Sequence, residues 1–102
     1  MITRLWHGWT NKENADAYEE LLRAKILPEI HRIDGFQGAW LLRRDVADGV
    51  EFITLTLFES MDAIRAFAGE DYEVAVVPPE ARQLLSSFDA RSQHYEAVIR
   101  ID

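Results

Sequence analysis

The chain has 102 residues, of which 48% are hydrophobic and 28% are charged, and its formal net charge is −7. This length allows one domain, residues 1–102, which buries roughly two-thirds of its unfolded surface. The acidic balance disfavours nucleic acid as a partner, because a field of this sign slows the approach of phosphate backbones. The chain has no cysteine, which excludes disulfides, thiolate metal sites and cysteine nucleophiles.

The opening residues, MITRLWHGWT, show no basic segment followed by an apolar one and no apolar run long enough to span a bilayer. We therefore expect a cytoplasmic protein that does not bind membranes. The three histidines lack the spacings of metal ligands, and the five glycines form no phosphate-binding loop. We expect no metal and no cofactor.

The first third of the chain predicts a strand and a helix. Residues 2–10 are rich in β-branched and aromatic types, with apolar side chains at both alternating positions, which indicates a strand. Cap-type residues then precede a helix over residues 10–26, whose apolar stripe consists of Tyr18, Leu21, Leu22 and Ile26. Pro28 cannot donate to the preceding turn, so a kink or a restarted turn is expected there. Gly35 ends the segment.

Two strands are predicted next, over residues 36–46 and 50–58, joined by the turn VADG. The second strand, VEFITLTLF, has almost no polar face and must therefore be central. Ser60 is a favourable N-cap for a short helix over residues 61–69, which Gly69 terminates.

The last third is less regular. Residues 70–77, EDYEVAVV, are ambiguous between helix and strand. A third helix is predicted over residues 78–88, because proline opens it and apolar residues follow at positions i, i+3, i+4 and i+7, namely Ala81, Leu84, Leu85 and Phe88. Alternation over residues 90–100 predicts the last strand.

This order, β-α-β-β-α-(α)-β, is typical of the α+β ferredoxin-like fold, in which helices cover one face of a four-stranded antiparallel sheet. The first and third strands are apolar on both faces, so the uncovered face is expected to meet another sheet. A homodimer that pairs two such faces is the simplest arrangement, because twofold assemblies are the commonest.

Three segments of the chain match one family: RLWHGWTNKENADAYEELL, GFQGAWLLRR and FITLTLFESMDAIRAF. They resemble the antibiotic biosynthesis monooxygenase family, and the last segment resembles its aromatic-Glu-Ser-x-(Asp/Glu)-Ala turn into the second helix. The resemblance extends over nearly the whole chain. It implies a dimeric α/β barrel with a cavity between the sheet and the helices of each subunit. Members include cofactor-independent oxygenases of quinol or anthrone-type aromatics, haem-degrading enzymes and proteins without an assigned activity.

The haem-degrading members carry an Asn on the first strand, a Trp on the second helix and a His on the helix after it. Alignment on the shared Phe-Glu-Ser run places Phe67 at the Trp position and Val77 at the His position, and the first strand has no Asn. Haem degradation is therefore disfavoured for this chain.

Oxygenation without a cofactor needs an apolar cavity, a base that removes a substrate proton and a hydrogen-bond donor near the oxygen that becomes charged. His7 and His94, on the terminal strands, are the candidate catalytic bases. Trp6, Trp9 and Tyr72 are the candidate substrate-binding residues. The terminal strands are neighbours in this fold, so the two histidines can face one cavity. A one-residue change of register reverses the face of each side chain, which leaves the faces open.

Each candidate also has a structural interpretation. A histidine in a strand is more often a hydrogen-bonded structural residue than a base, and the tryptophans also suit a core or a dimer face. Arg4 and Glu96 are expected to form a structural ion pair across the terminal strands.

The leading hypothesis is a dimeric, cofactor-independent monooxygenase that acts on a small aromatic substrate, with His7 or His94 as its base. The alternative is a non-enzymatic dimeric barrel that binds a small hydrophobic molecule or no ligand. A closed cavity on which a histidine and a tyrosine converge would favour the enzyme. An interior filled by the helix leucines and by Phe52, Phe58 and Phe67 would favour the alternative.

Overall fold

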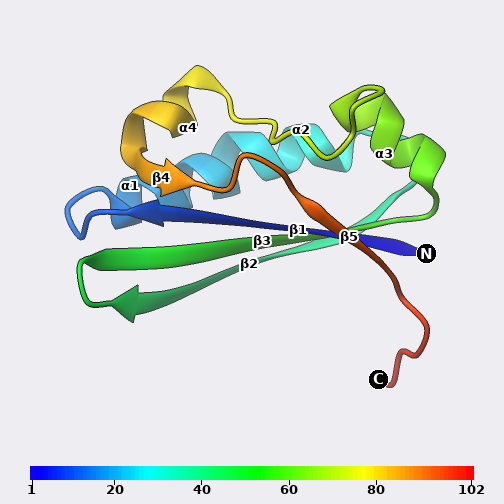
Figure 1. Ribbon diagram of the computed structural model, residues 1–102, viewed down its shortest axis with the longest axis horizontal. Coiled ribbons are helices and arrows are strands. Elements are labelled where there is room, and N and C mark those ends of the chain that lie inside the picture. Colours follow the sequence, from blue (N-terminus) through cyan, green and yellow to red (C-terminus); the bar gives the residue numbers. More distant parts are fainter.

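The computed structural model describes residues 1–102 and has two layers, an antiparallel sheet and a set of helices on one of its faces (Figure 1). The strands are β1 (Ile2–Thr10), β2 (Phe36–Val46), β3 (Gly49–Phe58), β4 (Leu85–Phe88) and β5 (Gln93–Glu96). The helical segments are α1 (Ala15–Leu21), the π-helix η1 (Leu22–Ile26), α2 (Leu27–His31), α3 (Met61–Ala68) and α4 (Pro79–Leu84). The predicted α+β fold is confirmed. No helix has the length and apolar character needed to cross a membrane.

The strands are arranged in the order β2-β3-β1-β4, with β5 also paired to β1, and every pairing is antiparallel. Strand β4 pairs with residues 8–10 of β1, and β5 pairs with residues 2–5. The place of the predicted fourth strand is therefore shared by two short strands along the same edge of β1.

The alternation of side chains gives the sheet two different faces. Arg4 and Trp6 of β1 point toward the helices, where they line a cavity. We call this side the closed face. The opposite side, which no helix covers, is the open face (Figure 1). The register of β1, β3 and β2 places there Leu5, His7, Trp9, Ile53, Leu55, Trp40 and Leu42.

The first helical region is continuous from α1 to α2 but widens before Pro28. In η1 the N–H of Leu27 donates to the carbonyl of Leu22, five residues earlier. Pro28 has no N–H, and in a regular helix its ring would collide with the carbonyl four residues before it. The π-turn relieves this conflict, so the predicted interruption takes the form of a wider turn and not of a break.

Helix α3 begins and ends as the sequence predicts. The hydroxyl of Ser60 accepts a hydrogen bond from the backbone N–H of Ala63 at 3.3 Å. Gly69 has a φ of 91°, a conformation that residues with a Cβ rarely adopt, and it closes the helix.

The prediction of a helix over residues 78–88 was wrong in its second half. Helix α4 ends at Leu84, and residues 85–88 form β4. Ser86 and Ser87, at the centre of β4, have low helix propensity. The edge of β1 has unpaired backbone groups with which this segment can form hydrogen bonds. The hydroxyl of Ser86 also donates to the carbonyl of Trp9 at 3.0 Å. Sheet pairing therefore overrides the helical spacing of the apolar residues.

The predicted strand over residues 90–100 is also shorter than expected. Strand β5 ends at Glu96, and one more backbone bond follows, from the N–H of Ala97 to the carbonyl of Met1 at 2.9 Å. Beyond that point β1 offers no backbone to pair with. Val98, Ile99 and Ile101 are accordingly exposed.

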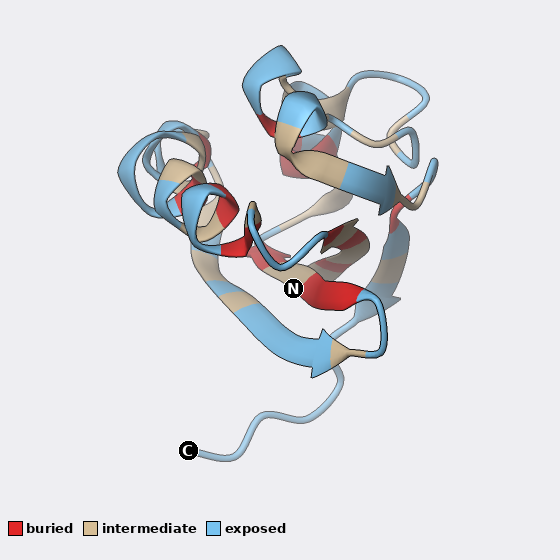
Figure 2. Cartoon of the chain, turned by 90° about the vertical axis from the view of Figure 1, so that its left-hand side faces the viewer, coloured by how far each residue is buried: buried red, intermediate tan, exposed pale blue.

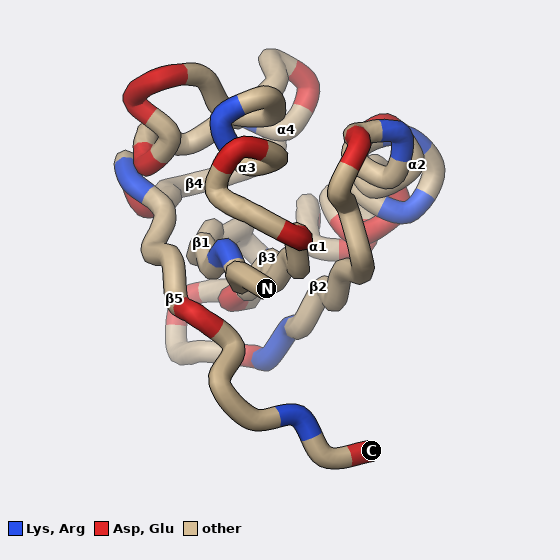
Figure 3. Tube along the Cα trace, turned by 90° about the vertical axis from the view of Figure 1, so that its right-hand side faces the viewer, with Lys and Arg blue, Asp and Glu red and all other residues tan.

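Two apolar clusters form the core between the helices and the closed face (Figure 2). In the first, the rings of Tyr18 and Phe52 meet edge to face, with centroids 4.8 Å apart. The second is built around Phe58 and Ile64, both fully buried. Charged residues lie mainly on the helices and connecting segments (Figure 3). The closed face is therefore where a buried site can form.

Candidate functional site

A cavity of about 60 Å³ lies between the two core clusters, enclosed by the closed face of the sheet and by the helices. Strands β1 and β3 form its floor, the helical region from α1 to α2 forms one wall, and Phe67 of α3 forms another. Residues 76–78 and Ala81 complete the enclosure. Most of the lining is apolar, with aromatic surface from Trp6, Tyr18 and Phe67.

A second space of about 230 Å³ adjoins this cavity. The two spaces share five lining residues, which stand between them: Ile26, Ile30, Phe67, Val76 and Pro78. Together their volumes come close to the lower end of small-molecule sites, ~300 Å³. Movement of these shared side chains would therefore create room for an aromatic ring.

The segment between α3 and α4, residues 69–78, closes the cavity, and we call it the strap. Arg91 holds it through Asp71 at 2.7 Å and Glu73 at 3.2 Å. The N–H of Ala75 donates to the carbonyl of Ala90 at 2.9 Å. Apart from one isolated bridge, of Val74 with Arg91, the strap has no regular secondary structure, so it is the part of the enclosure that can move most easily.

Arg4 is the only basic residue among the buried residues of the chain, with 5% of its surface exposed. Its Nη1 donates to the carbonyl of Tyr72 and lies 3.0 Å from Nε2 of His94, and its Nη2 donates to the carbonyl of Val74 at 3.2 Å. No carboxylate pairs with it. Burial lowers the pKa of Arg4 to about 10, so the guanidinium stays charged at neutral pH.

The expected ion pair between Arg4 and Glu96 is therefore not formed. In the register of β1 and β5, Arg4 faces His94, and Glu96 faces Ile2. The two residues sit two positions apart along paired strands, and Glu96 is exposed while Arg4 is buried. The sequence prediction placed an acid where the register places an imidazole.

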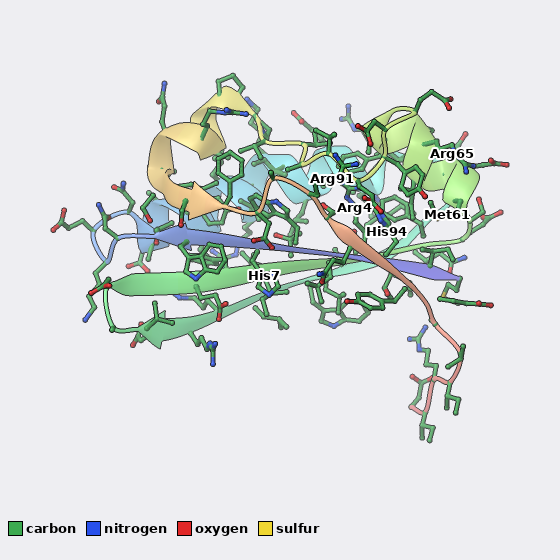
Figure 4. The ribbon with its side chains drawn as sticks, in the orientation of Figure 1. Arg4, His7, Met61, Arg65, Arg91 and His94 are labelled. Atoms are coloured by element: carbon green, nitrogen blue, oxygen red, sulfur yellow. The ribbon has the colours of Figure 1, made fainter.

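His94 is half-buried beside the cavity wall, next to Arg4 (Figure 4). A guanidinium only donates hydrogen bonds, so Nε2 of His94 must accept and Nδ1 must carry the proton. Nδ1 is buried and has no hydrogen-bond partner. Burial, followed by the charge of Arg4, lowers the pKa of His94 below its ordinary value, so the ring is neutral at pH 7.

His7 lies on the open face, on the other side of the sheet from His94 (Figure 4). Its Nδ1 is 2.9 Å from Oδ2 of Asp89, and its ring stacks on Trp9 with centroids 5.8 Å apart. The two histidines therefore do not share a cavity, contrary to the arrangement that the fold permitted.

The three predicted substrate-binding residues are also separated. Trp6 lines the cavity, and its indole N–H donates to the carbonyl of Asp89 at 2.7 Å. Trp9 lies on the open face. Tyr72 belongs to the strap and meets the ring of His94 edge to face, at 5.2 Å between centroids, but does not line the cavity.

Sequence reasoning missed Arg4 and Tyr18 as cavity residues. Tyr18 was assigned to the apolar stripe of the first helix, where it does lie, but its phenol also lines the cavity. Burial raises the pKa of Tyr18 to about 12, and a hydrogen bond with Thr54 opposes this shift. The phenol is therefore protonated at neutral pH and can donate. The only signal in the sequence was a hydroxyl-bearing aromatic in an otherwise aliphatic stripe.

The chain shows no group of three or more His, Cys, Asp or Glu side chains that could hold a metal ion. The two positions aligned with the haem-degrading members, Phe67 and Val77, both line the cavity. Neither side chain can coordinate iron. No histidine, cysteine or methionine lines the cavity.

A sequence model described as "Antibiotic biosynthesis monooxygenase" matches residues 1–79. No curated protein sequence matches the chain. A Bacillus cereus structure assigned to the same family is 15% identical, with a TM-score of 0.69 over 100% of this chain and 95% of that one. The haem degrader MhuD from Mycobacterium tuberculosis, solved with two haems bound, is 17% identical, with a TM-score of 0.65 over 100% of both chains.

A third similar structure is a monooxygenase from the ActVA-Orf6 gene of Streptomyces coelicolor, solved with nanaomycin D. It is 16% identical, with a TM-score of 0.61 over 99% of this chain and 92% of that one. At these identities the structural likeness shows the shared fold, and a common fold does not establish a common reaction.

Proposed function

The chain belongs to the antibiotic biosynthesis monooxygenase family, and on that premise we propose that it oxygenates a small quinol or anthrone-type aromatic without a cofactor. The observation that carries the proposal is the aromatic-lined cavity between the closed face and the helices, with the neutral imidazole of His94 beside it. An apolar, enclosed site suits a planar aromatic substrate.

The chemistry requires a base, a donor and dioxygen. The base removes a proton from the substrate, and the resulting anion reduces dioxygen. With an anthrone, a ring CH₂ group becomes a ketone; with a quinol, a ring C–H becomes C–OH and the ring is oxidised to a hydroxyquinone. In both net reactions one atom of dioxygen enters the product and the other leaves as water. Both oxygen atoms and all four electrons of the reduction are thereby accounted for without an external reductant.

Under this proposal His94 is the base and Tyr18 is the donor near the charged oxygen. His94 can accept a proton at Nε2 only when that atom leaves Arg4. Opening of the strap would allow this, because Arg4 is held in place by the carbonyls of Tyr72 and Val74. His7 lies on the open face and has no part in this step.

The small size of the closed cavity favours the alternative, in which the protein is a non-enzymatic member of the family that binds a small hydrophobic molecule or no ligand. A cavity of about 60 Å³ cannot accept a polycyclic substrate in the closed form. The enzymatic proposal therefore requires the strap to open, whereas the non-enzymatic alternative does not.

The proposal also includes a homodimer formed through the open face. Trp40 and Leu42 are each 47% exposed there, and Leu5, Ile53 and Leu55 continue the apolar surface across β1 and β3. An apolar sheet face of this extent is unfavourable in water. A second copy of the same face would bury it, and each subunit would keep its own cavity on the closed side.

The test is oxygen uptake with a panel of quinols and anthrones, using a variant that fills the cavity. Ala81 is 2% exposed and lines the cavity, so Ala81→Leu should block it. The matched control is Ala90→Leu, since Ala90 is exposed. We expect turnover in the wild type and the control and a loss of at least about tenfold in Ala81→Leu. Absence of oxygen uptake by the wild type across the panel would support the non-enzymatic alternative.

A further inference from the structure

Arg4 presents a positive charge that the protein does not neutralise. The six arginines that form ion pairs all have solvent-accessible side chains, unlike Arg4: Arg23, Arg43, Arg44, Arg65, Arg91 and Arg100. The chain has 18 acidic residues, yet none pairs with Arg4. Buried charges are ordinarily paired, because removal from water is unfavourable. The unpaired guanidinium of Arg4 is therefore available to bind an anion.

Two acidic residues of the strap pair with a different arginine. Asp71 and Glu73 belong to the strap, whose backbone carbonyls contact Arg4, but both carboxylates pair with Arg91. Arg91 is exposed, whereas Arg4 is buried. Arg91 therefore binds these two carboxylates of the strap, whereas Arg4 donates only to uncharged acceptors.

The guanidinium also has donors to spare. Of its five N–H groups, two on Nη1 serve Tyr72 and His94, and one on Nη2 serves Val74. Nε–H and one Nη2–H make no hydrogen bond within the protein. Nε and Nη2 lie along one edge of a guanidinium, and the donors of that edge match the two oxygens of a carboxylate. The Arg4 guanidinium carbon lies 5.4 Å from the centroid of the Phe67 ring, which supports its position in the cavity wall.

The remainder of the cavity is suited to an apolar body. Trp6, Tyr18 and Phe67 supply aromatic surface, and Leu22 and Ile26 supply aliphatic surface. One charged donor set at the edge of an aromatic enclosure selects a ligand with one charged group and a flat apolar remainder.

From this arrangement we infer that the cavity takes an aromatic monocarboxylate, with its carboxylate on Nε and Nη2 of Arg4 and its ring against Trp6 and Phe67. This inference rests on the proposed function, because it uses the same cavity. It narrows the aromatic substrate of that function to one that carries a carboxylate. The ring enters when the side chains between the cavity and its neighbouring space move apart.

The test is calorimetric titration of the intact protein with benzoate and with benzamide, which has nearly the same shape but no charge. We expect benzoate to bind at least tenfold more tightly than benzamide. Arg4→Gln should lose at least tenfold in benzoate affinity and leave benzamide binding unchanged. Arg32→Gln is the matched control, because Arg32 is exposed and forms no ion pair, and it should bind benzoate as the wild type does.

Arg4→Lys keeps the charge and protects the test against misfolding of Arg4→Gln. It should retain part of the preference for benzoate, since an ammonium is a point charge without the fork. Equal binding of benzoate and benzamide to the wild type, or no binding of benzoate, would overturn the inference and leave Arg4 as a fastener of the strap. The assay measures binding without turnover, so failure of oxygen uptake with quinols and failure of carboxylate binding are separate results.

Discussion

His94 on β5 and His7 on β1 lie on neighbouring strands of one sheet but have opposite surroundings. His94, on the closed face, accepts a hydrogen bond from the buried cation of Arg4 and has a lowered pKa. His7, on the open face, contacts the carboxylate of Asp89 and stacks on an indole. Strand parity alone determines which environment each ring enters. On the closed face, burial and the positive charge of Arg4 favour the neutral form of His94.

The largest expected effect is on the free energy of unfolding, because side chains on the closed face are more deeply buried than those on the open face. Phe52 is fully buried on the closed face, so Phe52→Ala should lower the free energy of unfolding by about 3–5 kcal/mol. Leu42→Ala on the open face should lower it by less than about 1 kcal/mol when unfolding is measured on the dissociated chain. Chemical denaturation of both variants checks this, and equal losses would mean that the open face is also a core.

A charge on the open face should prevent association there. We expect sedimentation to show a dimer for the wild type and a monomer for Leu42→Asp, with circular dichroism unchanged, because an aspartate would be buried without a partner in the paired sheets. Gln37→Asp, at an exposed position of the same strand, is the control and should remain dimeric. A wild type that sediments as a monomer at micromolar concentration would refute the paired-sheet proposal.

Lowering the pH should reduce the stability of the folded protein through His94 on the closed face. The folded pKa of His94 is lowered, so the folded state favours the neutral ring; its contribution to stability is present above the unfolded pKa of about 6.5 and decreases as the pH falls toward the folded pKa. His94→Gln should remove this part of the pH dependence. Thermal unfolding of both proteins between pH 7 and about 5 measures the difference, and identical profiles would contradict it.

Removal of the charge of Arg4 should raise the pKa of His94. Arg4→Met eliminates the charge that helps to lower the pKa of His94, so that pKa should rise toward its ordinary value while burial still holds it down. An NMR titration of the imidazole follows this directly. An unchanged or lower pKa would show that Arg4 does not act on His94.

The smallest effect is expected at the other histidine. The pair of His7 and Asp89 is partly exposed, with 28% and 40% of the side chains accessible, so it contributes about 0–1 kcal/mol. His7→Gln should therefore change the free energy of unfolding by no more than this amount. A loss of several kcal/mol in urea denaturation would mean that the pair has a structural role comparable to that of the core.

The sequence was sufficient for the elements from β1 to α3 and for the covering of one face by helices. It failed where tertiary pairing overrides local spacing, as at Leu85 and Phe88, whose helical positions became a strand beside β1. It also could not assign the faces of Trp6 and His7, because both parities of β1 carry large side chains. Arg4 was missed for the same reason, since only the register shows that it lies opposite His94 and under the strap.

The most direct test of the account is oxygen uptake by the wild type, His94→Ala and His7→Ala, assayed side by side with the substrate that the quinol and anthrone panel identifies. The exposed His31 supplies the control His31→Ala. We expect at least about a tenfold loss of turnover in His94→Ala and no loss in the other two, because His94 alone among the histidines hydrogen-bonds to a residue that lines the cavity, Arg4. Full turnover by His94→Ala, or a loss confined to His7→Ala, would contradict it and move the reacting site to the open face.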